Sequence, residues 1–490
     1  MASSPETTLA RLSELLDIVD ATSKSLRGFL QAEQRRKTEP SESNKSFSQS
    51  VADDLKLPFH ADTKISGQAA LLCLACERIK QAVASPRHIV FEAATSFWTA
   101  TALKIAVESD VASLILKISE ETGKEGVHVD ILSRYAKVEE DFLARLLRQL
   151  STSGIFQEIS PLVFSNTISS LTLVSKEFRS HLGIGLYAGM NAAAVLPEYL
   201  SQRFALAASA DASGRAAEYP PELLAPFNLV SKGKPFFQWL QLPENAAYAE
   251  NFNIGMRGHG VVEGLAFLAV DYPFVSLPAD TLIVDVGGGI GAAEDLILPS
   301  APHLRFVIQD LKSVVEQGVN DAGPNMKRWI DEGRVRFQAQ DFYAPQPREV
   351  EGAIFFAKSV FHNNPDSQVL RVLINIRQAK PSKLLVLDRL VIPHLRIESS
   401  TAAGESEIYQ KLRAGVKLSG ENGSDGDAEI VSSSQRITTT YDLYMGGFFA
   451  AKARTLDEWR TLLLQGGFRL TRLYPLRAST GQAIMEANPV

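Results

Sequence analysis

The stretch Leu282-Ile-Val-Asp285-Val-Gly287-Gly288-Gly289-Ile-Gly291 decides the fold. An apolar run leads directly into a glycine-rich turn, and a helical pattern follows. Glycine is needed where the backbone turns sharply and where a ligand must approach without a Cβ in the way. Taken alone such a turn is weak evidence, because it could bind a dinucleotide or no ligand at all. Its meaning depends on what the neighbouring segments carry.

After Pro278, strand-like runs alternate with helical segments. The runs cover residues 281–286, 304–308, 335–338, 352–357 and 383–387. This alternation predicts an α/β fold with a Rossmann-like, doubly wound sheet over residues 276–490. Residues 396–437 interrupt this alternation of strands and helices. They contain the polar run 419–427, which cannot build a core and predicts an insertion exposed to solvent.

Two acidic residues end the strands that follow the glycines. Asp310 lies about twenty residues downstream, where a carboxylate can accept the two hydroxyls of a ribose. Asp341 and Phe342 end the next strand, where a carboxylate can meet an adenine amino group and a ring can lie against the base. Each acid alone could be a solvated strand end. Three successive strand ends of this kind predict a site for a cofactor that carries a nucleoside.

The N-terminal half is predicted to be helical. We expect a helix and flexible linker over residues 1–50, a winged-helix domain over 51–175 and a helical substrate-pocket segment over 176–275. A winged helix in isolation suggests DNA binding, and its third helix offers Arg145 and Arg148. That helix also has a continuous apolar face, which favours packing or dimerisation instead.

The composition narrows the class of protein further. The net charge of −6 argues against a nucleic-acid partner, and no apolar run is long enough to span a membrane. Cys73 and Cys76 form a C-x-x-C pair with no second cluster, so we predict no metal site and expect two small buried residues. Few cysteines and no secretory signal point to the cytosol.

The segments around Asp310, Asp341 and the glycine turn resemble the metal-independent O-methyltransferases of plants and fungi, which use S-adenosylmethionine. The resemblance starts near residue 60 and includes Tyr441-Asp442-Leu and Arg454-Thr455-x-x-Glu458-Trp459. It implies a homodimer formed through the N-terminal domain. It also implies that the cofactor is held by Asp285, Gly287, Gly288, Gly289, Gly291, Asp310, Leu311, Asp341, Phe342 and Lys358.

The same resemblance implies a substrate pocket. In this family the segment Phe252-Asn253-x-x-Met256 lines that pocket. The polar insertion and the extra N-terminal helix fit a fungal member from specialised metabolism. Such an enzyme would methylate a hydroxyl of an aromatic or polyketide-like metabolite.

His362 falls on the family's general base. A phenol or enol attacks a sulfonium methyl well only as its anion, and a histidine titrating near neutral pH can remove that proton. The resemblance implies that Asp388 orients His362, and Lys358, four residues earlier, could face the same pocket.

Two departures from the family weaken that assignment. Asn363 and Asn364 stand where Asp-Trp is usual, and Ala453 replaces a glutamate that helps to orient the histidine. Asn363 is therefore expected to line the substrate pocket, at a position where the family usually has a carboxylate. A base that has lost one carboxylate partner should be a weaker base.

These departures leave a second hypothesis open. Some fungal relatives keep the cofactor site but act as pericyclases, which guide dehydration, Alder-ene or hetero-Diels–Alder steps on pyridone or polyketide intermediates. Such chemistry needs a shaped pocket and donors such as Lys358, and His181 could reach the pocket too, although a lone histidine there is more often structural. A third hypothesis, a non-enzymatic regulator, predicts a basic recognition helix and a damaged glycine turn, whereas the turn is intact and the chain is acidic.

Overall fold

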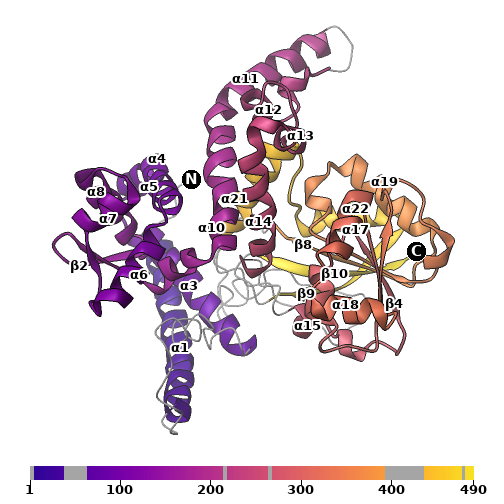
Figure 1. Ribbon diagram of the computed structural model, residues 1–490, viewed down its shortest axis with the longest axis horizontal. Helices are drawn as coiled ribbons and strands as arrows, with labels where there is room; N and C mark the ends of the chain where they lie inside the picture. Colours follow the sequence, from indigo (N-terminus) through magenta and orange to yellow (C-terminus); the bar gives the residue numbers. More distant parts are fainter. Residues whose placement is uncertain (1–4, 38–62, 213–217, 263–267, 392–434, 477–480) are drawn as a thin grey trace. The chain divides into compact units, whose positions relative to one another are not determined.

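The computed structural model describes residues 5–37, 63–212, 218–262, 268–391, 435–476 and 481–490 (Figure 1). The chain forms two compact units. The first comprises Met1–Leu223 and Phe227–Val261, and the second comprises Leu224–Pro226 and Val262–Val490.

The second unit is built on a sheet of seven strands in the order β6-β5-β4-β7-β8-β10-β9. Neighbouring strands run parallel from β6 to β8. These strands are β4 (Leu282–Val286), β5 (Arg305–Asp310), β6 (Val335–Ala339), β7 (Ile354–Lys358) and β8 (Lys383–Arg389). The predicted Rossmann-like sheet is thus confirmed. Because the strand order reverses at β4, the carboxyl ends of β4 and β7 flank the crevice where such sheets bind ligands.

Two strands in this sheet were not predicted. β9 (Phe468–Pro475) and β10 (Gln482–Pro489) pair antiparallel with each other, and β10 also pairs antiparallel with β8. The segment that forms β10 reads Gln-Ala-Ile-Met-Glu-Ala, which is rich in good helix formers. Its strand conformation therefore comes from pairing with β8 and not from local propensity.

Helices cover both faces of this sheet (Figure 1). Along β4, Ile283 packs into the cluster on one face and Val284 into the cluster on the other. Both faces are buried, which explains why the parallel strands read as continuous apolar runs. The helices of this unit are α15 (Leu268–Asp271), α16 (Ala292–Ile297), α17 (Lys312–Asn320), α18 (Pro324–Asp331), α19 (Asp366–Gln378), α21 (Gln435–Phe449) and α22 (Leu456–Gln465).

The predicted insertion falls mostly outside the described residues. Only its last three residues, 435–437, are described, and they begin α21.

The first unit begins with α1 (Pro5–Lys37) and α3 (Thr63–Val83), which pack against each other. α1 extends through residues 31–37, which were expected to belong to the linker, while residues 38–50 lie outside the described part. The expectation of buried cysteines is wrong, because Cys73 and Cys76 are both exposed. Leu71, Leu74 and Ala75 form the buried side of α3, and the cysteines lie on its other side.

Next come helices and a small sheet at the residues predicted for the winged segment. The helices are α4 (Pro86–Thr95), α5 (Phe97–Glu108), α6 (Val111–Thr122), α7 (Val129–Ala136), α8 (Glu140–Ser151) and α9 (Ile168–Leu171). The strands are β1 (Val127–His128), β2 (Phe156–Ser160) and β3 (Val163–Asn166), which form an antiparallel sheet. On α8, Arg145 pairs with Asp141 and Arg148 with Glu158. These ion pairs engage both arginines that could have contacted DNA.

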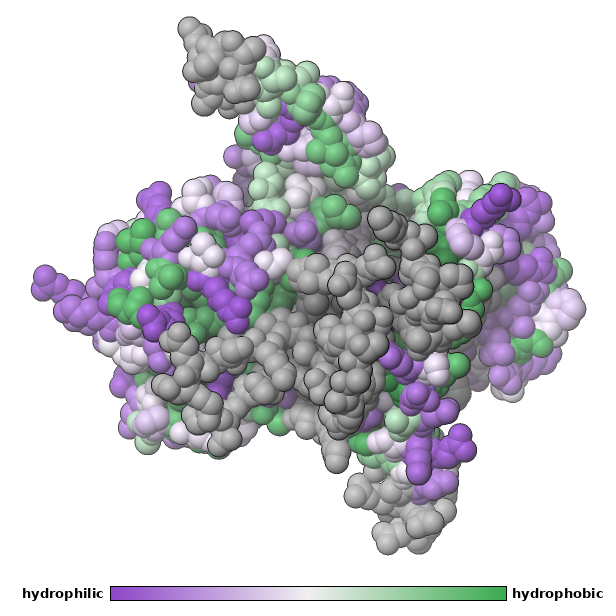
Figure 2. Space-filling view, turned by 180° about the vertical axis from the view of Figure 1, so that it is seen from behind, coloured by the Kyte–Doolittle hydropathy of each residue, from purple (hydrophilic) through white to green (hydrophobic). Residues whose placement is uncertain are grey.

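The remaining helices of this region are α10 (Lys176–Ile184), α11 (Met190–Ala212), α12 (Pro226–Val230), α13 (Phe236–Leu240) and α14 (Ala246–Val262). Leu200, Phe204 and Leu206 of α11 are exposed, and apolar colouring appears along this helix in Figure 2. None of the described helices is long and apolar enough to cross a bilayer. Within the described residues there is also no group of three or more His, Cys, Asp or Glu side chains that could hold a metal ion.

Candidate functional site

The glycine turn after β4 combines a tight backbone with one open position. A Cβ at Gly288 would lie 2.6 Å from Oδ2 of Asp285, and one at Gly287 would lie 2.8 Å from Cγ2 of Val360. A Cβ at Gly289 would meet nothing within 4 Å, although its φ of +63° still favours glycine. Gly287 and Gly288 therefore let the turn pack closely against Val360 and Asp285. Gly289 faces open space that a ligand can enter.

Asp310, at the end of β5, is bound to this turn. Its Oδ2 accepts the backbone N–H of Gly289 at 2.9 Å, and its Oδ1 accepts that of Leu311 at 2.7 Å. Each carboxylate oxygen can accept a further hydrogen bond, so the residue can hold the turn and still receive a hydroxyl. Leu311 is exposed beside it.

The end of β6 contributes an acid and a ring. Asp341 is exposed, and its Oδ1 accepts the backbone N–H of Tyr343 at 2.9 Å. The Phe342 ring lies 3.9 Å from the position of a Cβ at Gly287. The structure thus brings the predicted glycines, Asp310 and the Asp341–Phe342 pair to one edge of the sheet.

A pair of fully buried acids, Asp285 and Glu294, lies beneath the turn. Burial raises the pKa of Asp285 to about 6, and the positive charge of Lys358 offsets part of that rise. Burial, together with the Asp285 charge, raises the pKa of Glu294 well above its ordinary value. Both carboxyl groups therefore hold their protons to higher pH than exposed acids do. Sequence reasoning missed Glu294, because a glutamate in the first turn of a helix reads as a solvated residue.

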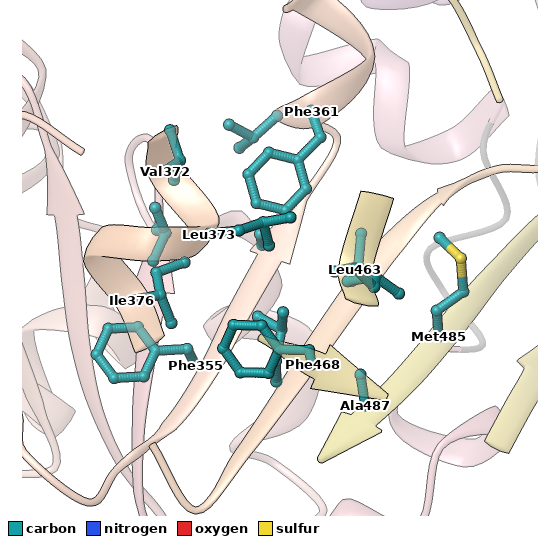
Figure 3. Close-up of a cluster of buried hydrophobic side chains, with 14 of the residues drawn as sticks. Phe355, Phe361, Val372, Leu373, Ile376, Leu463, Phe468, Met485 and Ala487 are labelled. Atoms are coloured by element: carbon teal, nitrogen blue, oxygen red, sulfur yellow. The ribbon is translucent and has the colours of Figure 1, made fainter. Parts of the chain in front are cut away.

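His362 lies four residues beyond the end of β7, in the short helical turn Phe361–Asn363. The preceding Phe361 packs in the cluster shown in Figure 3 with Leu373 and Phe468, which anchors this loop to the core. Nδ1 of His362 lies 2.7 Å from Oδ1 of Asp388 on β8. A carboxylate accepts the Nδ1–H, so the lone pair of the neutral ring is on Nε2.

Tyr441 on α21 meets the other ring nitrogen. Its hydroxyl oxygen lies 3.2 Å from Nε2 of His362. The Arg389 guanidinium lies over the Tyr441 ring, with its central carbon 3.6 Å from the ring centroid. The sequence suggested Tyr441 only as part of a family motif and suggested no role for Arg389.

Arg454 fixes the loop that carries His362. Although fully buried, it donates through Nε to Oδ1 of Asp366 at 2.8 Å. Its Nη1 and Nη2 donate to the carbonyls of Phe361 and Asn364 at 3.0 and 2.8 Å. These bonds hold the loop on both sides of His362.

The two asparagines after His362 also bond within the loop. Nδ2 of Asn363 lies 3.4 Å from the carbonyl of Ser359, and Nδ2 of Asn364 lies 2.9 Å from that of Val360. The Ala453 position is buried, and its N–H donates to Oδ1 of Asp442 at 2.9 Å.

Other predicted residues lie elsewhere. Lys358 ends β7 and is half-buried near the acid pair. His181 on α10 and the Phe252, Asn253 and Met256 segment of α14 belong to the first unit, and their role in a substrate pocket stays a prediction.

Comparisons with known proteins agree with this fold. Residues 230–414 match the model of the O-methyltransferase domain. The O-methyltransferase tpcA of Aspergillus fumigatus is 29% identical, and the match covers 82% of this chain and 83% of that protein. The sterigmatocystin 8-O-methyltransferase of Aspergillus parasiticus is 27% identical, and the match covers 68% of this chain and 73% of that protein.

Solved structures share the fold at lower identity. The complex of LepI with S-adenosylmethionine has a TM-score of 0.61 at 18% identity, covering 91% of this chain and all of that one. CalO1, a methyltransferase of calicheamicin biosynthesis, has a TM-score of 0.58 at 19% identity, covering 82% of this chain and 98% of that one. Residues 230–414 thus match an O-methyltransferase domain, and the observed sheet order and glycine turn agree with the similarity to fungal O-methyltransferases over most of the chain.

Proposed function

We propose that this protein is an S-adenosylmethionine-dependent O-methyltransferase that acts on a hydroxyl of an aromatic or polyketide-like fungal metabolite. The observation that carries the proposal is the buried His362–Asp388 pair at the strand ends beside the glycine turn. Such a pair is a general base held in one tautomer, which is what the methylation of a hydroxyl requires.

The residues at the turn fit the cofactor. Gly289 leaves open space for close approach, Asp310 can accept ribose hydroxyls, and Asp341 with Phe342 can receive the adenine. When bound, S-adenosylmethionine supplies a methyl group on a positively charged sulfur that is already activated for attack. The buried acid pair beneath the turn adds negative potential on the side where a cation would bind.

His362 would take the proton of the acceptor hydroxyl, and Asp388 would stabilise the imidazolium that results. General-base catalysis of this kind typically contributes about 10²- to 10⁴-fold in rate. Burial strengthens the interaction, because both side chains are at most 5% exposed and water screens them little. Arg454 keeps the histidine loop in position while the substrate binds.

The test supplies the protein with S-adenosylmethionine and a panel of phenols and pyridone alcohols. S-adenosylhomocysteine and isomers of the substrate are both followed by mass spectrometry. Methyl transfer that is lost in His362→Ala while cofactor affinity is retained would support the proposal. Conversion of a substrate without S-adenosylhomocysteine would refute methyl transfer.

A pericyclase is the second candidate. The observation that favours it is the presence of the buried Arg389 and of Tyr441 around His362, because these groups can polarise a carbonyl without removing a proton. A solved structure titled a pericyclic reaction enzyme shares the fold, with a TM-score of 0.60 at 16% identity. In the panel above, such an enzyme would yield substrate isomers alone.

We further propose a homodimer formed through the first unit. Val90, Phe91, Phe97 and Trp98 on α4 and α5 expose between 53 and 69% of their surface, which is unusual for large apolar side chains that lie near one another in sequence. Sedimentation analysis of the protein and of Trp98→Glu tests this, since a dimer that uses this face should dissociate in the variant. The cytosolic location stays a prediction, which fluorescent tagging of the chain can check.

A further inference from the structure

The proposed base has both ring nitrogens engaged. Nδ1 of His362 lies against Asp388, and Nε2 lies 3.2 Å from the hydroxyl oxygen of Tyr441. The side chain of His362 is only 5% exposed. An acceptor hydroxyl therefore cannot reach Nε2 in this arrangement unless Tyr441 moves away.

Tyr441 is placed to act between the base and an acceptor. It is half-buried, whereas His362 is buried, so the phenol lies on the more accessible side of the pair. The ring of Tyr441 is edge-on to the imidazole, with an interplanar angle of 89°, and its hydroxyl oxygen lies 3.2 Å from Nε2. The Arg389 guanidinium over the phenol ring favours negative charge that develops on its oxygen.

We propose that Tyr441 is a catalytic residue that relays the acceptor's proton to His362. The inference rests on the proposed methyl transfer. As the O–H bond of the acceptor breaks, its proton passes to the Tyr441 oxygen while the proton of Tyr441 passes to Nε2. The acceptor oxygen forms its bond to the methyl carbon, and the carbon–sulfur bond breaks with its electron pair left on sulfur. Asp388 stabilises the imidazolium until the proton returns to solvent.

The relay narrows the class of acceptor. Proton transfer is fastest when donor and acceptor are matched in acidity, and the relaying oxygen is that of a phenol. Phenolic or enolic hydroxyls should therefore be methylated, whereas an aliphatic alcohol of the same shape should not. The panel should include such a matched pair.

The main variant is Tyr441→Phe, which keeps the ring and removes only the hydroxyl. Tyr444→Phe is the matched control, because Tyr444 is also half-buried, lies one turn along α21 and stacks on Phe448. We expect kcat to fall about a hundredfold in Tyr441→Phe, as for the loss of a general acid–base group, with cofactor affinity unchanged and with Tyr444→Phe close to the wild type. The double variant Tyr441→Phe/His362→Gln should be no slower than His362→Gln alone, because both residues serve one proton path.

A second measurement needs no turnover. In protein labelled with ¹⁵N-histidine, the Nε2 resonance of His362 should move toward that of a free imidazole nitrogen in Tyr441→Phe and stay in place in Tyr444→Phe. If Tyr441→Phe fails to fold, difluorotyrosine at position 441 keeps the hydroxyl and makes it more acidic. The relay then predicts a shift of the pH dependence of kcat to lower pH.

The outcomes separate the two proposals. Methyl transfer by Tyr441→Phe that is as fast as, or faster than, that of the wild type overturns the relay and leaves the proposed function standing. An unmoved Nε2 resonance, or an unmoved pH profile with difluorotyrosine, also overturns it. If the wild type forms no S-adenosylhomocysteine with any acceptor, the proposed function fails and the relay fails with it.

Discussion

Replacement of Asp388 by asparagine probes the proposed base most directly. The substitution keeps the size of the side chain and removes its negative charge. An asparagine can place its NH₂ group toward Nδ1, which would put the ring proton on Nε2. His362 would then have no lone pair on the side of Tyr441, and its charged form would lose its partner.

The size of the effect follows from the geometry. Two opposite charges near 4 Å apart interact by about 4 kcal/mol at the effective dielectric typical of proteins. The Nδ1–Oδ1 distance of 2.7 Å and the near-complete burial of both groups place this pair at or above that value. Since 1.36 kcal/mol corresponds to a factor of ten, kcat should fall by about a thousandfold.

The assay is formation of S-adenosylhomocysteine under saturating cofactor, with cofactor affinity measured separately by calorimetry. Asp388→Glu serves as the control, since it keeps the carboxylate and should retain activity within about tenfold, a cost of one misplaced hydrogen bond. A rate for Asp388→Asn within threefold of the wild type, at unchanged affinity, would show that His362 does not act as a carboxylate-supported base.

Four further outcomes are expected. Arg454→Met should lower the free energy of unfolding by about 1–3 kcal/mol in denaturant titrations, because it leaves the carbonyls of Phe361 and Asn364 without their donor. An unchanged midpoint would show that Arg454 does not hold the His362 loop in place. The wild type should lose stability as pH rises from about 4 through about 6, because the folded state binds the proton of Asp285 more tightly than the unfolded chain does. Glu294→Gln should be more stable than the wild type at pH 8 in thermal melts, because it removes one of the two buried carboxyl groups. If the melting temperatures of the variant and the wild type change equally with pH, the buried acid pair is not the cause of the pH dependence. Gly289→Val should abolish cofactor binding in calorimetry, whereas Gly333→Val, with a similar positive φ at the opposite end of β6, should cost stability and leave affinity unchanged.

Local sequence determined the parts of the site that are local. The strand, the glycine turn and the acid at the end of β5 all lie within about thirty residues, the span of one βαβ unit. Apolar runs and glycines carry their structural meaning within such a span. The same holds for the placement of His362 shortly after β7, because the strand that precedes it is a clear apolar run.

Most of what surrounds His362 was decided by the tertiary structure. Asp388 is 26 residues from His362 in sequence, and Tyr441 is 79 residues away. The sequence resemblance pointed to Asp388, whereas only the packing of α21 shows that the Tyr441 hydroxyl contacts Nε2 of His362. The hydrogen bonds by which Arg454 holds the His362 loop likewise join residues that are about 90 positions apart in sequence.

The sequence by itself determined the five parallel strands and the glycine turn, because strand periodicity and glycine conformations are set by neighbouring residues. Only the tertiary structure decided that Glu294 is buried beside Asp285, that β10 is a strand and that the hydroxyl of Tyr441 lies against Nε2 of His362. Burial, strand pairing and contact between distant segments depend on the whole fold. The local sequence around a residue therefore does not predict them.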